Sequence, residues 1–246
     1  MRLAILTDIH ANREAFEAVL ADCAGMRIDR YVFLGDIVGY GPDPAWCIDK
    51  LVEMIAAGAI AVRGNHDRAV GVPDGALNSN ARRVIDWTVD RLSAAHKAVL
   101  SDLPLTVAED DLLFVHASAN DPQDWIYVTS EHHAMPSFRV SKARVIFCGH
   151  VHKPALYSHD MSGRVMGHGF GYGTGVPLIR SRRWLAVVGS VGQPRDGSGL
   201  ASWSIMDTEK NELTFRRVGY DSATTARKVR SAGLPEALAA RLVKGI

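Results

Sequence analysis

The chain has 246 residues, of which 47% are hydrophobic and 22% are charged, a balance that is typical of a globular protein and argues against intrinsic disorder. The formal net charge is only +1 and no run of like charges stands out, so a surface for long nucleic acids is not expected. Three cysteines, scattered along the chain, are too few for a disulfide framework or a cysteine-rich zinc cluster.

The N-terminal stretch MRLAILTDIH is apolar for only a few residues before Asp8, which is too short for the core of a signal peptide. No other stretch approaches the length of a membrane span. The scarcity of cysteine favours a reducing compartment. We therefore expect a cytoplasmic protein that does not cross a membrane.

Short apolar runs that end abruptly in acidic, amide or histidine residues recur along the chain. Each run is four or five residues long and lacks alternation, which is typical of strands buried on both faces. In chain order, the runs are 3–6 before Asp8 and His10, 31–34 before Asp36, 59–62 before Asn65, His66 and Asp67, 112–115 before His116, and 145–148 before His150 and His152.

Helical patterns separate these runs in roughly the first hundred residues. Asn12 is a candidate N-cap for a helix that continues to about Cys23, and Pro44 suits the first turn of a second helix. A third helical pattern begins near Asn80. The alternation of strands and helices predicts parallel strands joined by crossover helices.

The polar residues after the five runs are expected to lie together. Binding sites of parallel sheets collect at the carboxyl ends of the strands, so neighbouring strands would bring these residues to one edge. The pair His150 and His152 alone is also typical of an ordinary surface loop. The whole set of strand-end residues, however, favours a metal or catalytic site.

The second half of the chain is less informative. Residues 161–175 are rich in glycine but lack the spacing of a dinucleotide fingerprint, so we predict a turn or hairpin there and no ligand role for His159 or His168. Since no linker is visible, residues 1–246 are predicted to form a single domain. The remaining predicted elements are a strand over 184–188, a hairpin of 202–206 with 212–218, and two short helices over 227–244 that are divided at Gly233 and Pro235.

Five sequence blocks together resemble the calcineurin-like metallophosphoesterase superfamily. Each block alone is common, but all five in this order are specific. The blocks are Asp8-Ile9-His10, Gly35-Asp36, Gly64-Asn65-His66-Asp67, His116, and Gly149-His150-Val151-His152. The stretch GSVGQPRDG at 189–197 extends the resemblance to the bacterial phosphodiesterase and diadenosine-tetraphosphatase-like branch.

The resemblance implies an α/β fold, a four-layer α-β-β-α sandwich in which two mixed β-sheets pack face to face with helices outside. It does not extend to the protein serine/threonine phosphatases of the superfamily. Their Gly-Asp-x-x-Asp-Arg-Gly pattern is absent, since Asp36 is followed here by IVGYG, and Asp67 stands where they carry glutamate. A phosphoprotein substrate is therefore not expected.

The resemblance also implies two divalent metal ions. It assigns Asp8, His10 and His152 to the first ion, Asn65, His116 and His150 to the second, and Asp36 to a bridge between them. Such a mixed nitrogen and oxygen set suits Mn, Fe or Zn better than Ca or Mg.

His66 is implied as the general acid that protonates the leaving oxygen, with Asp67 orienting its imidazole. The alternative for His66 is a supporting position behind the metal ligands.

Other candidate residues have weaker support. Asn12 is either a phosphate-binding donor or a plain N-cap, and Arg195 is either a phosphate ligand or an exposed surface arginine. Trp125 and Tyr127 follow the fourth block; stacking on a nucleobase is one interpretation, and core packing is favoured. Tyr40 is a candidate for lining the pocket.

The sequence thus predicts a dinuclear metal-dependent phosphoesterase that hydrolyses a small phosphodiester or phosphoanhydride by in-line attack of a metal-bridging hydroxide. A nucleotide, such as a dinucleoside polyphosphate, is among the candidate substrates. The alternative is a non-catalytic metal-binding scaffold or interaction module of the same fold, which the complete set of ligand positions disfavours. Loops 121–137 and 160–180 are expected to determine the choice of substrate.

Overall fold

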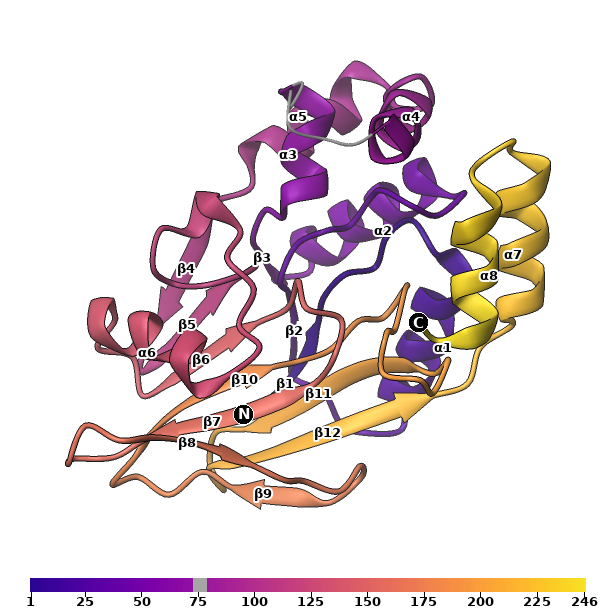
Figure 1. Ribbon diagram of the computed structural model, residues 1–246. Helices are drawn as coiled ribbons and strands as arrows, with labels where there is room; N and C mark the ends of the chain where they lie inside the picture. Colours follow the sequence, from indigo (N-terminus) through magenta and orange to yellow (C-terminus); the bar gives the residue numbers. More distant parts are fainter. Residues whose placement is uncertain (73–78) are drawn as a thin grey trace.

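The computed structural model describes residues 1–72 and 79–246, and two six-stranded β-sheets lie at its centre (Figure 1). The first sheet has the order β3-β2-β1-β11-β12-β9, with bounds Ile60–Ala61, Arg30–Phe33, Arg2–Leu6, Ala201–Asp207, Glu212–Val218 and Gly175–Pro177. The second has the order β4-β5-β6-β10-β7-β8, with bounds Thr106–Glu109, Leu112–Val115, Val145–Cys148, Arg183–Val187, Ala155–His159 and Val165–His168.

Both sheets are mixed. In the first sheet β1, β2 and β3 are parallel, whereas β11, β12 and β9 pair antiparallel. In the second sheet β5, β6 and β10 are parallel, and β4, β7 and β8 each pair antiparallel with their neighbours. The parallel strands are the short apolar runs of the sequence, and their lack of alternation reflects burial on both faces.

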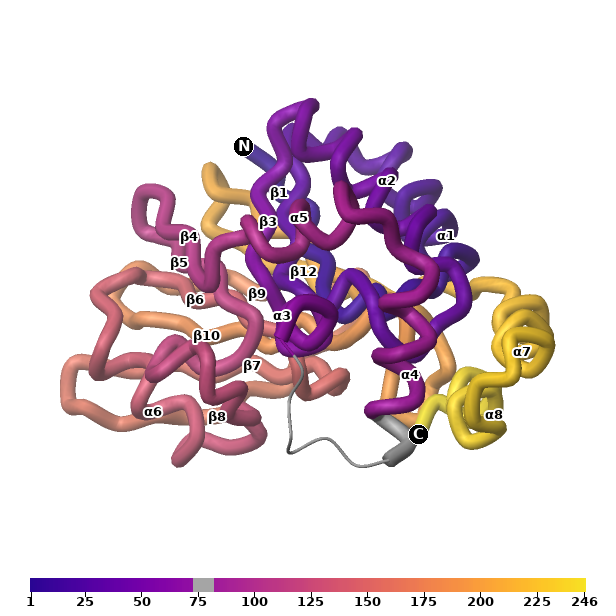
Figure 2. Tube along the Cα trace, turned by 90° about the horizontal axis from the view of Figure 1, so that it is seen from above, coloured from indigo at the N-terminus to yellow at the C-terminus, as the bar shows by residue number. Residues whose placement is uncertain are grey.

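Eight α-helices and one short 3₁₀-helix cover the sheets in the described residues. Figure 2 shows α7 and α8 together at one end of the molecule, on the side of α1 and far from α6 and β8. The helices are α1 (Arg13–Ala24), α2 (Pro44–Ala56), α3 (Asn65–Gly71), α4 (Ser79–Val89), α5 (Ala94–Asp102), η1 (Pro122–Asp124), α6 (Glu131–Val140), α7 (Ser222–Ser231) and α8 (Glu236–Lys244). None of these helices is both long enough and apolar enough to cross a bilayer, a finding that covers the described residues only.

The hydrophobic core has the layers expected of the predicted sandwich. Ile5 and Val32 of the first sheet pack against Phe114 and Phe147 of the second in one buried cluster. A second cluster joins the outer face of the first sheet to α1 and α2, and a third joins the outer face of the second sheet to α6. The four-layer α-β-β-α architecture is therefore confirmed.

The strand ends meet in a different way from the single edge that was expected. The first three apolar runs belong to the first sheet and the last two belong to the second sheet, so they are not neighbours in one sheet. The loops that follow the strands join the two sheets, because Val191 N donates to Thr7 O at 3.0 Å and Gly192 N donates to Asp8 O at 2.8 Å. The polar strand-end residues thus converge between the sheets.

Several local predictions are confirmed. Asn12 caps α1, with its Oδ1 accepting from Ala15 N at 3.1 Å, and α2 begins at Pro44. The two C-terminal helices are separated as predicted, although α7 begins earlier, behind the N-cap Asp221.

The glycine-rich stretch 161–175 begins in the turn of a hairpin, as predicted, because β7 and β8 pair antiparallel across residues 160–164. It holds β8 and leads into β9, and these two strands lie in different sheets. Because β9 pairs with β12 and not with β8, the stretch crosses from one sheet to the other.

Candidate metal centre

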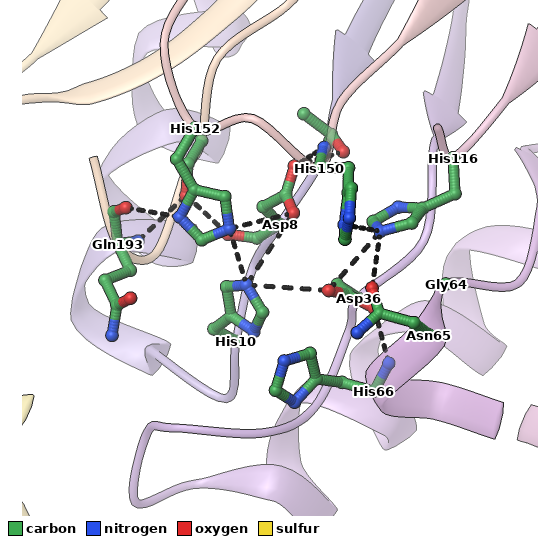
Figure 3. A network of polar contacts seen from close by, with 12 residues as sticks. Asp8, His10, Asp36, Gly64, Asn65, His66, His116, His150, His152 and Gln193 are labelled. Carbon is green, nitrogen blue, oxygen red and sulfur yellow. Dashed lines mark hydrogen bonds and ion pairs between the residues drawn. The ribbon is translucent and has the colours of Figure 1, made fainter. Parts of the chain in front are cut away.

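The side chains predicted as ligands gather at the carboxyl ends of β1, β2, β3, β5 and β6 (Figure 3). Three overlapping groups each bring their ligand atoms within 4.8 Å of one another, and all of their members are buried. The groups are Asp8 with His10 and His152, Asp36 with His116 and His150, and His10 with Asp36 and His66. The first two groups contain the histidine and aspartate residues of the two implied ligand sets, and the third group adds His66.

The backbone of this region is unusual. Asp8, His10, Asp36, His150 and His152 all have positive φ, between 50° and 67°. Non-glycine residues rarely adopt this conformation, which costs energy and concentrates at functional sites. It also explains why His150 and His152, two positions apart, face different groups, because an extended strand would direct both side chains to the same side.

His10 and His152 present lone pairs to each other. Their Nε2 atoms are 3.0 Å apart, and their Nδ1 atoms lie 3.1 Å from Val38 O and 2.6 Å from Gln193 O. A carbonyl oxygen only accepts hydrogen bonds, so each Nδ1 carries a proton, and in the neutral imidazole Nε2 is then the unprotonated nitrogen. Two unprotonated nitrogens cannot hydrogen-bond each other, whereas a cation between them binds both.

Asp8 completes this first group. Its Oδ2 accepts from Thr7 Oγ1 at 2.7 Å and from His150 N at 2.9 Å. Its Oδ1 is buried without a hydrogen-bond partner, although it lies 3.1 Å from His152 Nε2. A buried carboxylate oxygen without a donor is costly, and a metal ion supplies the missing partner.

The second group repeats this arrangement. His116 Nδ1 donates to Leu34 O at 2.7 Å, so its Nε2 is the ring nitrogen that faces the centre. Asn65 Oδ1 and His150 Nδ1 each lie 3.1 Å from that nitrogen.

Asp36 lies between the two groups. Its Oδ2 is 3.7 Å from His10 Nε2 and 3.4 Å from His116 Nε2, while its Oδ1 accepts from the backbone N–H of His66 at 2.8 Å. Figure 3 shows its carboxylate between the two pairs of histidines, which is where a bridging ligand would stand.

The protonation states suit cation binding. Burial disfavours the ionised carboxylates, but the surrounding histidines outweigh it and hold the pKa of Asp8 and of Asp36 well below the ordinary value. Burial lowers the pKa of His152, and burial with the neighbouring His116 lowers that of His150 to about 4. Metal ligands must be ionised carboxylates and neutral imidazoles, and most of the centre is already in that state.

His116 is the exception. Burial disfavours its charged form, but the Asp36 carboxylate outweighs this effect and raises the pKa of His116 to about 9. A cation that binds here would displace that proton. Because the donors are carboxylate, amide and imidazole groups, with no cysteine in any of the three groups, the set fits divalent transition metals.

His66 lies beside Asp36 at the start of α3. Its ring packs edge-on against His10, with centroids 5.0 Å apart, and lies tilted against the Tyr40 ring, with centroids 4.4 Å apart. Its Nδ1 is buried without a hydrogen-bond partner. Burial lowers the pKa of His66 to about 3, against the opposing effect of Asp36.

Asp67 has a different role from the one implied by the resemblance. Its Oδ1 accepts from the N–H groups of Ile37 and Val38 at 2.9 and 3.2 Å, and its Oδ2 accepts from Gly64 N at 3.0 Å. Within the described residues it makes no hydrogen bond to the His66 ring. Asp67 therefore does not orient the imidazole directly; it ties the loop after β2 to the first turn of α3.

The two weaker candidates, Asn12 and Arg195, both make contacts inside the fold. Asn12 caps α1 and donates its Nδ2 to Gly192 O at 2.8 Å, which supports the plain N-cap and argues against a phosphate contact. Arg195 is half-buried and is not an exposed surface residue. Its guanidinium donates to Gln193 Oε1 at 2.7 Å and lies 5.8 Å from the centre of the Tyr40 ring.

The sequence interpretation missed two parts of the centre. The first is the set of carbonyls of Leu34, Val38 and Gln193 that fix the imidazoles. Two of them flank the Gly-Asp block, and the third lies in the stretch GSVGQPRDG. The second is the pair of aromatic residues after His116, for which core packing was favoured. Tyr127 is 49% exposed and stacks on His150 at 4.1 Å, and Trp125 packs edge-on against His116 at 5.8 Å.

Comparisons with known proteins concern the family and the fold of the chain. A model of the calcineurin-like phosphoesterase superfamily domain matches residues 1–211. An uncharacterized protein from Methanocaldococcus jannaschii is 32% identical over 249 residues, which cover 99% of this chain and 98% of the relative. The crystal structure of a metallophosphoesterase from Sphaerobacter thermophilus is 38% identical, covers 100% of both chains and has a TM-score of 0.90. A hypothetical protein from Pyrococcus horikoshii, 19% identical over 100% of this chain and 98% of its own, shares the fold with a TM-score of 0.81.

Proposed function

Because this chain belongs to the calcineurin-like phosphoesterase superfamily, we propose that it is a dinuclear metal-dependent enzyme that hydrolyses a small phosphodiester or phosphoanhydride. Membership of the superfamily confirms the resemblance drawn from the five sequence blocks. The family and the candidate ligand groups make the chain a metal-dependent phosphoesterase; the number of ions, their identity and the substrate are our proposal.

One observation carries this proposal. Two groups of buried donors face each other across Asp36, and each group directs imidazole nitrogens and a carboxylate oxygen toward its own centre. Two divalent ions, with manganese as the first choice to test, supply the charge that neutralises phosphoryl oxygens and lowers the pKa of water.

The chain's own residues hold and protonate the substrate. We assign His66 as the proton donor to the leaving oxygen, since its imidazole lies beside Asp36 without a partner at Nδ1. Burial disfavours its charged form, and the negative charge of a bound phosphate counteracts that effect. Arg195, which lies near His152, offers forked donors for a phosphate oxygen. Asp67 acts as a positioning residue through the loop that carries Asn65 and His66.

The remaining assignments concern the compartment, the domain organisation and the class of substrate. The three cysteines are free and buried, in agreement with a reducing, cytoplasmic compartment. One buried cluster joins both sheets, in agreement with a single domain over residues 1–246. A small phosphorylated substrate, nucleotides included, is the proposed partner.

The test uses purified protein loaded with Mn²⁺ on panels of phosphate monoesters, diesters and dinucleoside polyphosphates. We expect hydrolysis of at least one diester or anhydride. We expect His66→Asn to lower kcat by a factor on the order of 10² to 10⁴ while the bound metal is unchanged. The matched control is His96→Asn, since His96 lies on α5 and contacts Asp49, outside the candidate centre.

Two outcomes would contradict these assignments. Absence of hydrolysis across all panels by the metal-loaded protein would reject the enzymatic function and favour the scaffold alternative. Loss of metal in His66→Asn, with normal turnover per bound metal, would reject the acid role alone.

A further inference from the structure

An aromatic side chain lies open beside the half of the centre that contains His116 and His150. Tyr127 is 49% exposed and the preceding Ile126 is 40% exposed, although both stand next to a buried polar cluster. One face of the Tyr127 ring stacks on His150, with centroids 4.1 Å apart and an interplanar angle of 23°. No second ring packs on Tyr127 within the described residues, so one face remains for a ligand.

The segment that carries Tyr127 is fixed at both ends. Val128, the next residue, is 1% exposed and belongs to the cluster under α6. The hydroxyl of Ser118, before the segment, and that of Ser137, after it, form a hydrogen bond of 3.0 Å. Trp125 adopts a φ of +53° and packs on His116. A preorganised ring loses little conformational entropy when it binds a ligand.

The charges near the centre are distributed unevenly. Arg195 lies on the side of His152 and Tyr40, where it is suited to anions. The segment of Tyr127 instead carries the exposed carboxylates of Asp121 and Asp124. These carboxylates disfavour further phosphate groups beside them, whereas an uncharged planar group is not repelled.

Resting on the proposed function, we propose that Tyr127 forms a stacking subsite for a planar aromatic group, such as a nucleobase, that is attached to the phosphate held at the metal centre. The outer face of the phenol ring binds the base, and His150 supports the inner face. The substrate is then a nucleotide derivative, oriented with its base toward Tyr127 and its anionic part toward Arg195. Base–aromatic stacking is strong enough to decide such a preference.

Binding to the Mn²⁺-loaded protein tests the subsite without turnover. Isothermal calorimetry compares adenosine 5′-monophosphate with ribose 5-phosphate, which has the same phosphate and sugar but no base. We expect the wild type to bind the nucleotide more tightly by a factor on the order of ten or more. Tyr127→Leu should remove this preference with the affinity for ribose 5-phosphate unchanged, and Tyr127→Phe should keep it.

Two controls make the result specific. Ile126→Ala removes the neighbouring exposed side chain and should keep the preference for the nucleotide. Metal content, measured for each variant, should stay at the wild-type level, because Tyr127 stacks on His150 but supplies no ligand atom.

The proposal of a stacking subsite is contradicted if the wild type binds both compounds with equal affinity. It is also contradicted if Tyr127→Leu weakens the binding of both compounds by the same factor. Failure of the proposed function is seen separately, as a wild type that hydrolyses no phosphate ester yet still prefers the nucleotide.

Discussion

Replacement of Gly39 by alanine should impair catalysis without removing the metal. Gly39 precedes Tyr40 in the loop after β2 and has a φ of +88°. A Cβ built at this position would lie 2.4 Å from His66 Nδ1 and 2.9 Å from its Cγ. Glycine is thus required here partly because the imidazole of His66 occupies the space of a side chain.

The size of the effect follows from this distance. A contact to Cβ shorter than 3.0 Å is essentially never seen, so the ring must move by at least 0.6 Å. The ring is confined by His10 and Tyr40, so it cannot move freely. A misplacement of about 1 Å at a reacting group can cost about 10²-fold in rate. We therefore expect Gly39→Ala to lower kcat by about tenfold to a hundredfold.

The control is Gly58→Ala. Gly58 has a φ of +97°, and nothing lies within 4 Å of a Cβ built there. Both variants should lose about 1–2 kcal/mol of stability, because alanine is disfavoured at positive φ. Only Gly39→Ala should also displace His66, so a comparison of the two variants separates backbone strain from the effect on the ring.

The assay combines kcat on a diester, metal content and calorimetric unfolding for both variants. A kcat of Gly39→Ala equal to that of Gly58→Ala would refute the reasoning, since His66 would then tolerate displacement. Loss of metal in Gly39→Ala would also refute it, because Val38 would then have transmitted the change to the ligand His10.

Three further outcomes are expected. Loading with Mn²⁺ at about a hundredfold excess over its Kd should stabilise the EDTA-treated protein by about 2.7 kcal/mol for each bound ion, seen as a higher Tm, because the ions give Asp8 Oδ1 and the facing imidazoles their missing partner. Burial raises the pKa of the Cys23 thiol from 9.0 to about 12. The thiol therefore ionises first in the unfolded chain, and the free energy of unfolding falls as the pH rises above 9.0. Urea unfolding below and above that pH should show a smaller fall in the free energy of unfolding for Cys23→Ala than for the wild type. Asp22→Ala should cost about 1–3 kcal/mol in the same unfolding assay with kcat unchanged, since Asp22 accepts from the indole N–H of the fully buried Trp203 at 3.0 Å.

The residues at the strand ends could be predicted because their signal is local. A short apolar run followed by Asp, Asn or His is visible in the sequence, as is the helix start at Pro44. The distribution of the strands over two sheets could not be predicted from the residues alone, because the apolar pattern of a buried strand does not specify its partner. The resemblance supplied that information.

The partners of Asp67 had no local signal either. Its carboxylate binds the N–H groups of Ile37 and Val38, which lie about thirty positions earlier, and backbone amides are present at every residue except proline. The exposure of Tyr127 was equally hidden, because an aromatic residue between polar ones is compatible with a core or with an open site. Such contacts are fixed by the tertiary fold.

Hydrogen bonds between the loops hold the strained backbone of the ligand residues in place. Each non-glycine residue with positive φ costs on the order of 1–3 kcal/mol, and it is retained only where the surroundings fix it. Here Asp8 N donates to Gly35 O at 3.0 Å and His10 N donates to Asp36 O at 2.9 Å, so each ligand-bearing loop holds the next. These bonds form between segments of distant sequence and therefore only in the folded chain. The donors are consequently positioned by the protein before a cation arrives, and ion binding need not order the loops.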